Sequence, residues 1–182
     1  MERNSSVGSA SPTFTVVDEA PLDDLPLEPV VKKILCARVY EVCKETPISP
    51  APQLSKKINN TVVIKREDLH SVFSFKIRGA YNKIAGLSDE DRAKGIITAS
   101  AGNHAQGVAM SAQKLGIKAT IVMPIVTPLI KVDAVRSRGE NVNVVLKGDN
   151  FNEASDHCQQ LLREHGYVDI FVFIYVVFPI YE

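Results

Sequence analysis

The sequence contains no tryptophan, only three cysteines and no excess of either charge, since 21 basic residues balance 21 acidic ones among 182. This balance argues against recruitment of a nucleic acid or an anionic membrane surface by bulk electrostatics. Cys36, Cys43 and Cys158 have neither metal-ligand spacing nor the pattern of a disulfide framework. We therefore expect no nucleic-acid partner, no metal site, a reducing compartment, and buried thiols at Cys36 and Cys43.

Apolar segments that could address the chain to a membrane are also lacking. The N-terminus has no apolar core of a secretory signal peptide. The apolar run 170–181 is shorter than the roughly twenty residues that a membrane span needs. We expect an intracellular, soluble protein, in the cytoplasm or in an organelle such as a plastid or a mitochondrion.

The pattern of apolar residues divides the chain. Residues 1–27 are rich in Ser, Pro and Asp without periodicity, which predicts a disordered leader. Apolar residues at helical spacing predict a helix over 28–44, and Pro47, Pro50 and Pro52 predict an extended connector after it. Short apolar runs then alternate with amphipathic segments: the predicted strands are Val62–Lys65, Ile96–Ala99, Lys118–Met123 and Val142–Leu146, and the predicted helices are Ile77–Leu87, Asn103–Leu115, Pro128–Ser137 and Asn152–His165. This alternation predicts an α/β fold, with a parallel sheet flanked by helices.

Lys76 is the first candidate for chemistry. Phe73, Phe75 and Ile77 surround it with apolar side chains, Arg78 adds a second cation nearby, and the lysine lies at a predicted helix start. Each of these features disfavours a positive charge, so a neutral amine is favoured. A neutral lysine amine is a nucleophile that can form a Schiff base. The alternative interpretation is an ordinary surface lysine at a helix start.

The second candidate is the loop Ser100–His104, which joins a predicted strand to a predicted helix. Its small residues let the backbone approach a ligand, and the first N–H groups of a helix lack intrahelical partners. The loop therefore predicts a carboxylate or phosphate site, with an ordinary strand–helix turn as the alternative. It matches neither a Walker loop nor a GxGxxG fingerprint, which argues against a nucleotide.

Together these motifs resemble threonine ammonia-lyase (threonine dehydratase), a fold-type-II pyridoxal-phosphate enzyme related to the tryptophan synthase β chain. The resemblance runs from about Ile34 to Gly166 and is carried by the segments Lys65–Asp68, Val72–Asn82, Ser100–Ala109, Ile121–Pro124, Lys131–Arg136 and Gly148–Phe151. It implies deamination of L-threonine to 2-oxobutanoate and ammonia, the first step of isoleucine biosynthesis. The cofactor implied is pyridoxal 5'-phosphate, and the small-molecule partner is threonine or serine.

The resemblance also implies roles for matching residues. Lys76 would hold the cofactor covalently and remove the α-proton of the substrate. Phe75 would pack against the pyridine ring, and Asn103 would hydrogen-bond the phenolic oxygen of the cofactor. The substrate carboxylate would be bound by the loop residues Ser100, Ala101, Gly102, Asn103 and His104. The His104 side chain is expected to be structural.

The acidic and polar residues just before Lys76 are not assigned catalytic roles. Glu67 and Asp68 are expected to pair with Lys65, Arg66 or Arg78 rather than to act as acids or bases. His70 and Ser71 stand where this family usually has Gln and Pro, and neither is assigned a role.

The resemblance stops after Tyr167. We interpret 28–167 as the N-terminal part of the catalytic domain, including its small domain, and 168–182 as a divergent apolar tail. In this family the site lies between two domains, and 28–167 would supply the smaller one and only the start of the larger. Such an incomplete site would bind the cofactor weakly and turn over threonine negligibly. The alternatives are a serine racemase or serine dehydratase type of enzyme, and a non-catalytic truncated isoform that associates with full-length subunits. A homo-oligomer is considered for a full-length chain.

Overall fold

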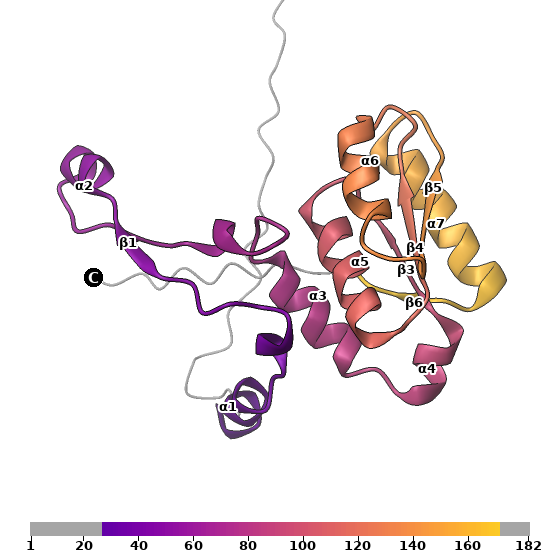
Figure 1. Cartoon of the computed structure of the whole chain (residues 1–182), viewed down its shortest axis with the longest axis horizontal. Coiled ribbons are helices and arrows are strands. Elements are labelled where there is room, and N and C mark those ends of the chain that lie inside the picture. Colours follow the sequence, from indigo (N-terminus) through magenta and orange to yellow (C-terminus); the bar gives the residue numbers. More distant parts are fainter. Residues whose placement is uncertain (1–26, 172–182) are drawn as a thin grey trace, which may run out of the picture. The chain divides into compact units, whose positions relative to one another are not determined.

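The computed structural model describes residues 27–171 (Figure 1). Helix α1 (Leu27–Leu35) and the residues after it up to Ala37 belong to one unit, and the elements from Arg38 onward belong to a second. The helix predicted over 28–44 is therefore too long. The chain leaves α1 after Leu35 and makes a separate 3-10 turn, η2 (Val39–Glu41), in which the Arg38 side chain pairs with Glu41.

Because of this break, Cys36 and Cys43 do not lie on one helix. Cys43 and Cys158 are buried, whereas Cys36 is exposed, so the prediction for Cys36 is wrong. The predicted leader apart from Leu27, and residues 172–182 of the predicted tail, lie outside the described residues.

A four-stranded parallel sheet forms the centre of the second unit. Its strands are β3 (Ile96–Ala99), β4 (Ala119–Met123), β5 (Val142–Leu146) and β6 (Val168–Asp169), in the order β5-β4-β3-β6. In the register, Ile97 lies opposite Thr120 on one side and Asp169 on the other. Parallel strands covered on both faces favour continuous apolar runs, which is the pattern of β3 and β4. The predicted α/β class is confirmed.

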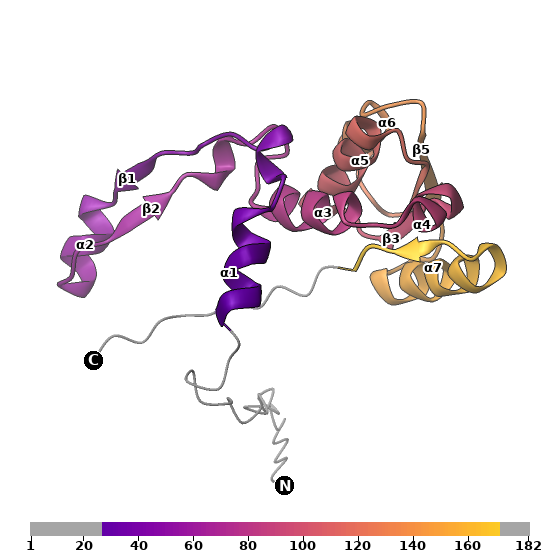
Figure 2. The same ribbon diagram turned by 90° about the horizontal axis from the view of Figure 1, so that it is seen from below.

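Helices cover both faces of this sheet (Figures 1 and 2). Helices α3 (Lys76–Ala85), α5 (Asn103–Leu115) and α6 (Leu129–Arg136) pack on one face, where Ile96, Ile121 and Met123 are fully buried. On the opposite face, α7 (Phe151–His165) buries Cys158 against Ile97. No helix within residues 27–171 combines the length and the apolar character that a membrane span requires.

The N-termini of α4 and α7 are capped by side chains of the residue types that favour this position. Helix α4 (Asp89–Lys94) begins after Ser88, whose Oγ accepts a hydrogen bond of 3.1 Å from the Asp91 N–H. Helix α7 begins after Asn150, whose Oδ1 accepts one of 3.1 Å from the Glu153 N–H. Side-chain acceptors at this position satisfy N–H groups that have no partner within the helix.

A hairpin replaces the extended connector that the prolines predicted. Strand β1 (Ile48–Pro50), helix α2 (Pro52–Ile58) and strand β2 (Val63–Lys65) form the arm, which we define as residues 48–65. The two strands pair antiparallel, with Ile48 opposite Lys65. Pro52 does not interrupt this structure, because the first position of a helix tolerates a residue without an N–H. The connector prediction is therefore wrong.

Candidate active site

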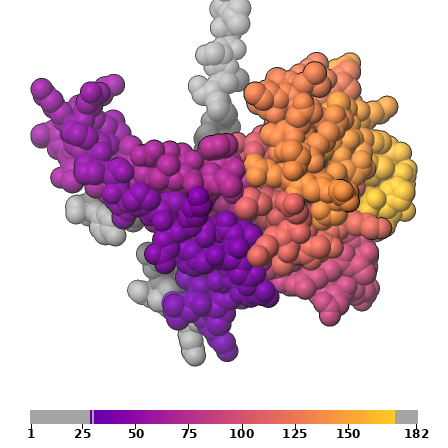
Figure 3. Space-filling view, viewed as in Figure 1, coloured from indigo at the N-terminus to yellow at the C-terminus, as the bar shows by residue number. Residues whose placement is uncertain are grey.

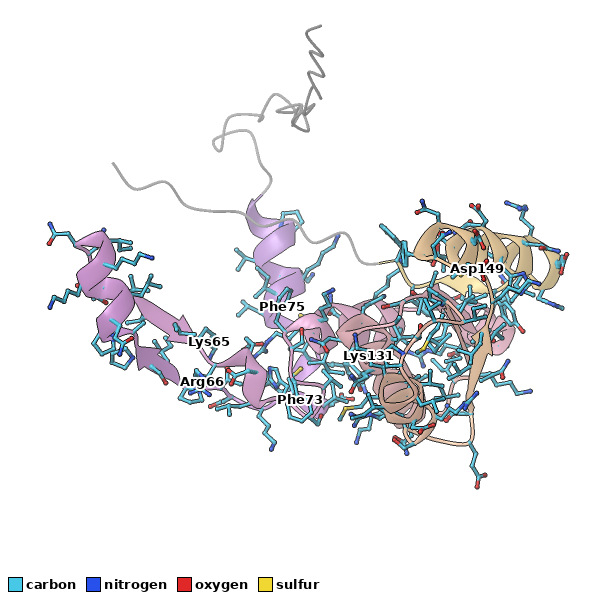
Figure 4. The ribbon with its side chains drawn as sticks, turned by 90° about the horizontal axis from the view of Figure 1, so that it is seen from above. Lys65, Arg66, Phe73, Phe75, Lys131 and Asp149 are labelled. Atoms are coloured by element: carbon cyan, nitrogen blue, oxygen red, sulfur yellow. The ribbon has the colours of Figure 1, made fainter. Side chains whose placement is uncertain are left out.

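Lys76 is the first residue of α3 and its side chain is half-buried. Its backbone N–H donates a hydrogen bond of 3.3 Å to the Ser74 Oγ, and the following Ile77 is fully buried. The position at a helix start agrees with the sequence prediction. The apolar enclosure does not, because Phe73 is 70% and Phe75 47% exposed on the segment that leads into α3 (Figure 4).

The loop Ser100–His104 connects β3 directly to α5. The Ser100 N–H extends the strand pairing by donating to the Val122 carbonyl at 3.0 Å, and the Gly102 N–H donates to the Ser100 Oγ at 3.4 Å. The Gln106 N–H donates to the Gly102 carbonyl at 3.3 Å. Positions 103–105 form the first turn of α5, where N–H groups precede the first intrahelical acceptors. These N–H groups are the donors that a helix start offers to an anion.

A close helix contact brings Lys76 and this loop together. A Cβ atom placed on Gly107, in the second turn of α5, would lie 3.4 Å from the Cα and 3.5 Å from the N of Ile77. The first turn of α3 therefore packs directly on the first two turns of α5. As a result, the starts of α3 and α5, which carry Lys76 and Asn103, lie in one region. The Phe75 and Asn103 side chains are exposed there.

His104 is buried at the start of α5, with 9% of its surface exposed. Its Nε2 lies 2.7 Å from the Ile170 carbonyl oxygen, which can only accept, so Nε2 carries the hydrogen. Burial lowers the pKa of His104, and the nearby charge of Lys76 lowers it further. A neutral imidazole that holds the end of β6 fits the structural role expected for this side chain, although its role stays a prediction.

The acidic residues before α3 form the expected ion pairs. Glu67 accepts hydrogen bonds from Arg78, with its Oε2 2.7 Å from Nε and its Oε1 2.9 Å from Nη2. Asp68 pairs with Arg66 at 2.7 Å on the exposed surface. Lys65 and Arg66 lie at the end of β2 (Figure 4). Hydrogen bonds from Arg78, then from Thr46 and His70, lower the pKa of Glu67 to about 2 despite partial desolvation.

Arg138 contributes contacts that the sequence interpretation did not find. Its Nη2 donates to the Ser71 carbonyl at 3.0 Å and to the Gln106 Oε1 at 3.2 Å. It thereby joins the segment before α3 to α5, and the two regions lie in contact in the space-filling view (Figure 3). Ser71 and Arg138 are far apart in the sequence, so no local pattern signals this contact.

Known proteins with similar sequences identify the family of this chain. The sequence pattern of the pyridoxal-phosphate dependent enzymes matches residues 39–174. The chain belongs to that family. Within it, the chain is 53% identical over 137 residues to a biosynthetic L-threonine dehydratase of Burkholderia multivorans, a match that covers 75% of this chain and 27% of the relative. It is 49% identical over 154 residues to the mitochondrial threonine dehydratase of Saccharomyces cerevisiae, covering 85% of this chain and 26% of the relative.

Solved structures of the pyridoxal-phosphate dependent family agree. The processed form of threonine deaminase isoform 2 from Solanum lycopersicum superposes with a TM-score of 0.74 at 42% identity, covering 88% of this chain and 50% of that one. Maize serine racemase superposes with a TM-score of 0.70 at 31% identity, covering 78% and 43%. The chain thus spans about a quarter of the length of the curated relatives it matches, with 27% and 26% for the two named above.

The residues present fit the family's cofactor. Lys76 supplies an amine for an aldehyde carbon, and the start of α5 supplies N–H donors for an anionic group. A Cβ atom on Gly102 would meet nothing within 4 Å, so the space next to these donors is open. Lys76 and the loop Ser100–His104 together therefore provide both kinds of group that an amino-acid substrate on pyridoxal phosphate requires.

Proposed function

We propose that this chain carries the lysine and the carboxylate-binding loop of an enzyme that deaminates L-threonine to 2-oxobutanoate and ammonia, the entry step of isoleucine biosynthesis. The observation that carries the proposal is the packing of α3 on α5 at Gly107, which brings together the helix starts that carry Lys76 and Asn103. The names of the most similar curated relatives support threonine as the substrate.

Lys76 has two tasks in this proposal. Its Nζ would hold the cofactor through the aldehyde carbon, with the aldehyde oxygen leaving as water, and as a free amine the same Nζ would accept the α-proton of the substrate. When bound, pyridoxal phosphate supplies an electron sink for the charge that develops at the α-carbon. The next residue, Ile77, is fully buried, which fixes the backbone position from which the Lys76 side chain extends.

The loop Ser100–His104 would orient the substrate. The first N–H groups of α5 would donate to a carboxylate at the helix start, where the helix dipole would add a favourable contribution of about 0.3–1 kcal/mol. The Ser100 Oγ would provide a further hydrogen bond to the carboxylate. Asn103 is exposed beside this position and would donate to the phenolic oxygen of the cofactor, and Phe75 would cover the ring.

Reductive trapping tests the role of Lys76. The chain is incubated with pyridoxal phosphate, reduced with borohydride and digested, and the labelled peptides are identified by mass spectrometry. We expect the label on Lys76, its loss in Lys76→Ala, and its retention in Lys83→Ala, which removes another lysine of α3. Label spread evenly over the lysines would contradict the proposal.

Substrate protection tests the choice of amino acid. L-threonine should suppress labelling of Lys76 because its amine competes for the same aldehyde carbon. Suppression at lower concentrations of L-serine than of L-threonine would instead favour a serine-directed enzyme, in line with the similarity to serine racemase. A chimera that joins this chain to the remaining length of the Burkholderia relative tests deamination: it should release 2-oxobutanoate, and Lys76→Ala should abolish that release.

A further inference from the structure

The turn that precedes Lys76 is strained. Phe73 has a φ of 55°, a left-handed conformation that is an outlier for a bulky residue. Its N–H donates to the His70 carbonyl at 2.8 Å, which closes the turn. A residue in this conformation costs on the order of 1–3 kcal/mol and persists only when its surroundings determine it from several sides. The restraint must come from contacts on both sides of this turn.

The Glu67 carboxylate accepts hydrogen bonds from residues on both sides of this turn. Its carboxylate receives the two hydrogen bonds from Arg78, a third from the Thr46 Oγ1 at 2.6 Å, and a fourth from His70 Nε2 at 2.8 Å. Thr46 is 6% and His70 2% exposed, so these donors have little access to water. Deleting the carboxylate would leave buried donors unpaired, which is more costly than a missing surface contact.

The other side of His70 is also engaged. Its Nδ1 accepts a hydrogen bond of 3.4 Å from the Lys44 N–H. Since an N–H can only donate, Nδ1 is unprotonated and Nε2 carries the hydrogen that Glu67 accepts. The imidazole therefore links the chain before the arm to Glu67 after it. Lys76 lies between two residues of this cluster, six positions after His70 and two before Arg78.

We propose that Glu67 is a positioning residue: through Arg78 and His70 it holds the strained turn at Phe73 and thereby sets the direction of Lys76. This inference rests on the proposed function, because it concerns the orientation of the reactive lysine. Glu67 touches neither the cofactor nor the substrate in this role. The Glu67 carboxylate joins Thr46, before the arm, to Arg78, in the first turn of α3, and we call this set of hydrogen bonds the clamp.

The test compares Glu67→Gln with Asp68→Asn. Both substitutions neutralise a carboxylate, but the Arg66–Asp68 pair is exposed and local, so it serves as the matched control. Two quantities are measured on the full chain: the rate of reductive labelling of Lys76 by pyridoxal phosphate relative to Lys83, and the hydrogen exchange of backbone amides over 70–80. We expect Glu67→Gln to lower the labelling ratio and to accelerate exchange in this segment, each by about tenfold, as expected for loss of a charged hydrogen bond. Asp68→Asn should leave both unchanged.

The two measurements separate this inference from the proposed function. If Lys76 is not labelled in the wild-type chain, the proposed function fails, and amide exchange alone still decides whether Glu67 holds the turn. If Glu67→Gln leaves both quantities as in the wild type, the inference is overturned. Exchange over 70–80 that stays as in the wild type while the slowest amides of α5 and α7 accelerate would assign Glu67 a general structural role and would also overturn it.

A second, milder variant tests the same hydrogen bonds in case Glu67→Gln does not fold. Arg78→Lys keeps the charge but cannot make two parallel hydrogen bonds to the carboxylate. It should fold and show a smaller change of the same sign in the labelling ratio and in the exchange of 70–80. A folded Arg78→Lys chain with wild-type values for both would contradict the clamp.

Discussion

Gly148, in the turn between β5 and α7, combines a φ of +82° with a close approach of backbone. A Cβ atom there would lie 2.6 Å from the Glu153 Cβ and 2.8 Å from the Ala154 N. A side chain at this position would therefore both strain the backbone and clash with the start of α7. At Gly116, φ is +67° but a Cβ atom would meet nothing within 4 Å. Substitutions at the two glycines therefore separate the free-energy cost of a left-handed backbone from the cost of a steric clash.

We predict that Gly116→Ala lowers the free energy of unfolding by about 1 kcal/mol, the usual cost of a left-handed residue with a Cβ. Gly148→Ala should lower it by roughly 2 kcal/mol more, because the start of α7 must also shift. Urea denaturation followed by circular dichroism measures both values. Equal losses at the two positions would show that the turn before α7 can make room.

Between elements, the ion pair of Glu67 and Arg78 predicts a pH dependence. The hydrogen bonds from Arg78 first, and then those from Thr46 and His70, lower the pKa of Glu67 from 4.5 to about 2. A carboxyl group whose pKa is lower in the folded state adds stability above its unfolded pKa and loses it as the pH falls through the folded pKa. This contribution should be complete above pH 5 and disappear as the pH approaches 2.

The measurement is the difference in free energy of unfolding between the wild type and Glu67→Gln across this pH range. We expect a difference on the order of 2 kcal/mol at pH 6 that shrinks steadily with acidification, because protonated Glu67 and Gln both lack a charge. A difference that stays constant down to pH 2 would mean that the loss in Glu67→Gln comes from packing rather than from the charge.

The elements also show which features the sequence could predict. The strands Ile96–Ala99 and Val142–Leu146 and the helix Asn103–Leu115 were predicted with the bounds that the structure has, because apolar runs and helical periodicity are local signals. The strand Val62–Lys65 was also predicted and corresponds to β2 (Val63–Lys65). The rest of the arm was missed, because the pairing of Ile48 with Lys65 depends on contacts distant in sequence and the prolines suggested a connector.

In the candidate site, too, local sequence signals were detected and contacts between distant residues were not. Lys76 and the loop Ser100–His104 were found from residue types next to predicted helix starts, and the pairing of Glu67 with Arg78 was among the expected alternatives. Thr46 and Arg138 were not found, since their partners are far away along the chain. The roles of the site residues remain predictions until the labelling experiments are done.

Over the whole second unit, stability depends on the core that the sheet shares with α3, α5 and α6. Ile170 follows β6, is 0% exposed and belongs to this core, whereas Ile130 on α6 is 79% exposed. We predict that Ile170→Ala lowers the free energy of unfolding by about 2–4 kcal/mol through lost burial and a cavity, while Ile130→Ala changes it by less than about 0.5 kcal/mol. Thermal or urea unfolding compares the two. Similar losses would place Ile170 outside the cooperative core.

The hydrogen bonds of Glu67 to Thr46 and Arg78 have a consequence for the arm as a polymer segment. They fasten both of its ends at one point, so residues 48–65 form a loop whose closure is decided at its base. The entropy of closing a flexible loop grows only with the logarithm of its length. Insertions or deletions near Asn59, where the chain turns back with a φ of 52°, would therefore change the closure entropy little, and the position of Lys76 would depend little on the length of the tip.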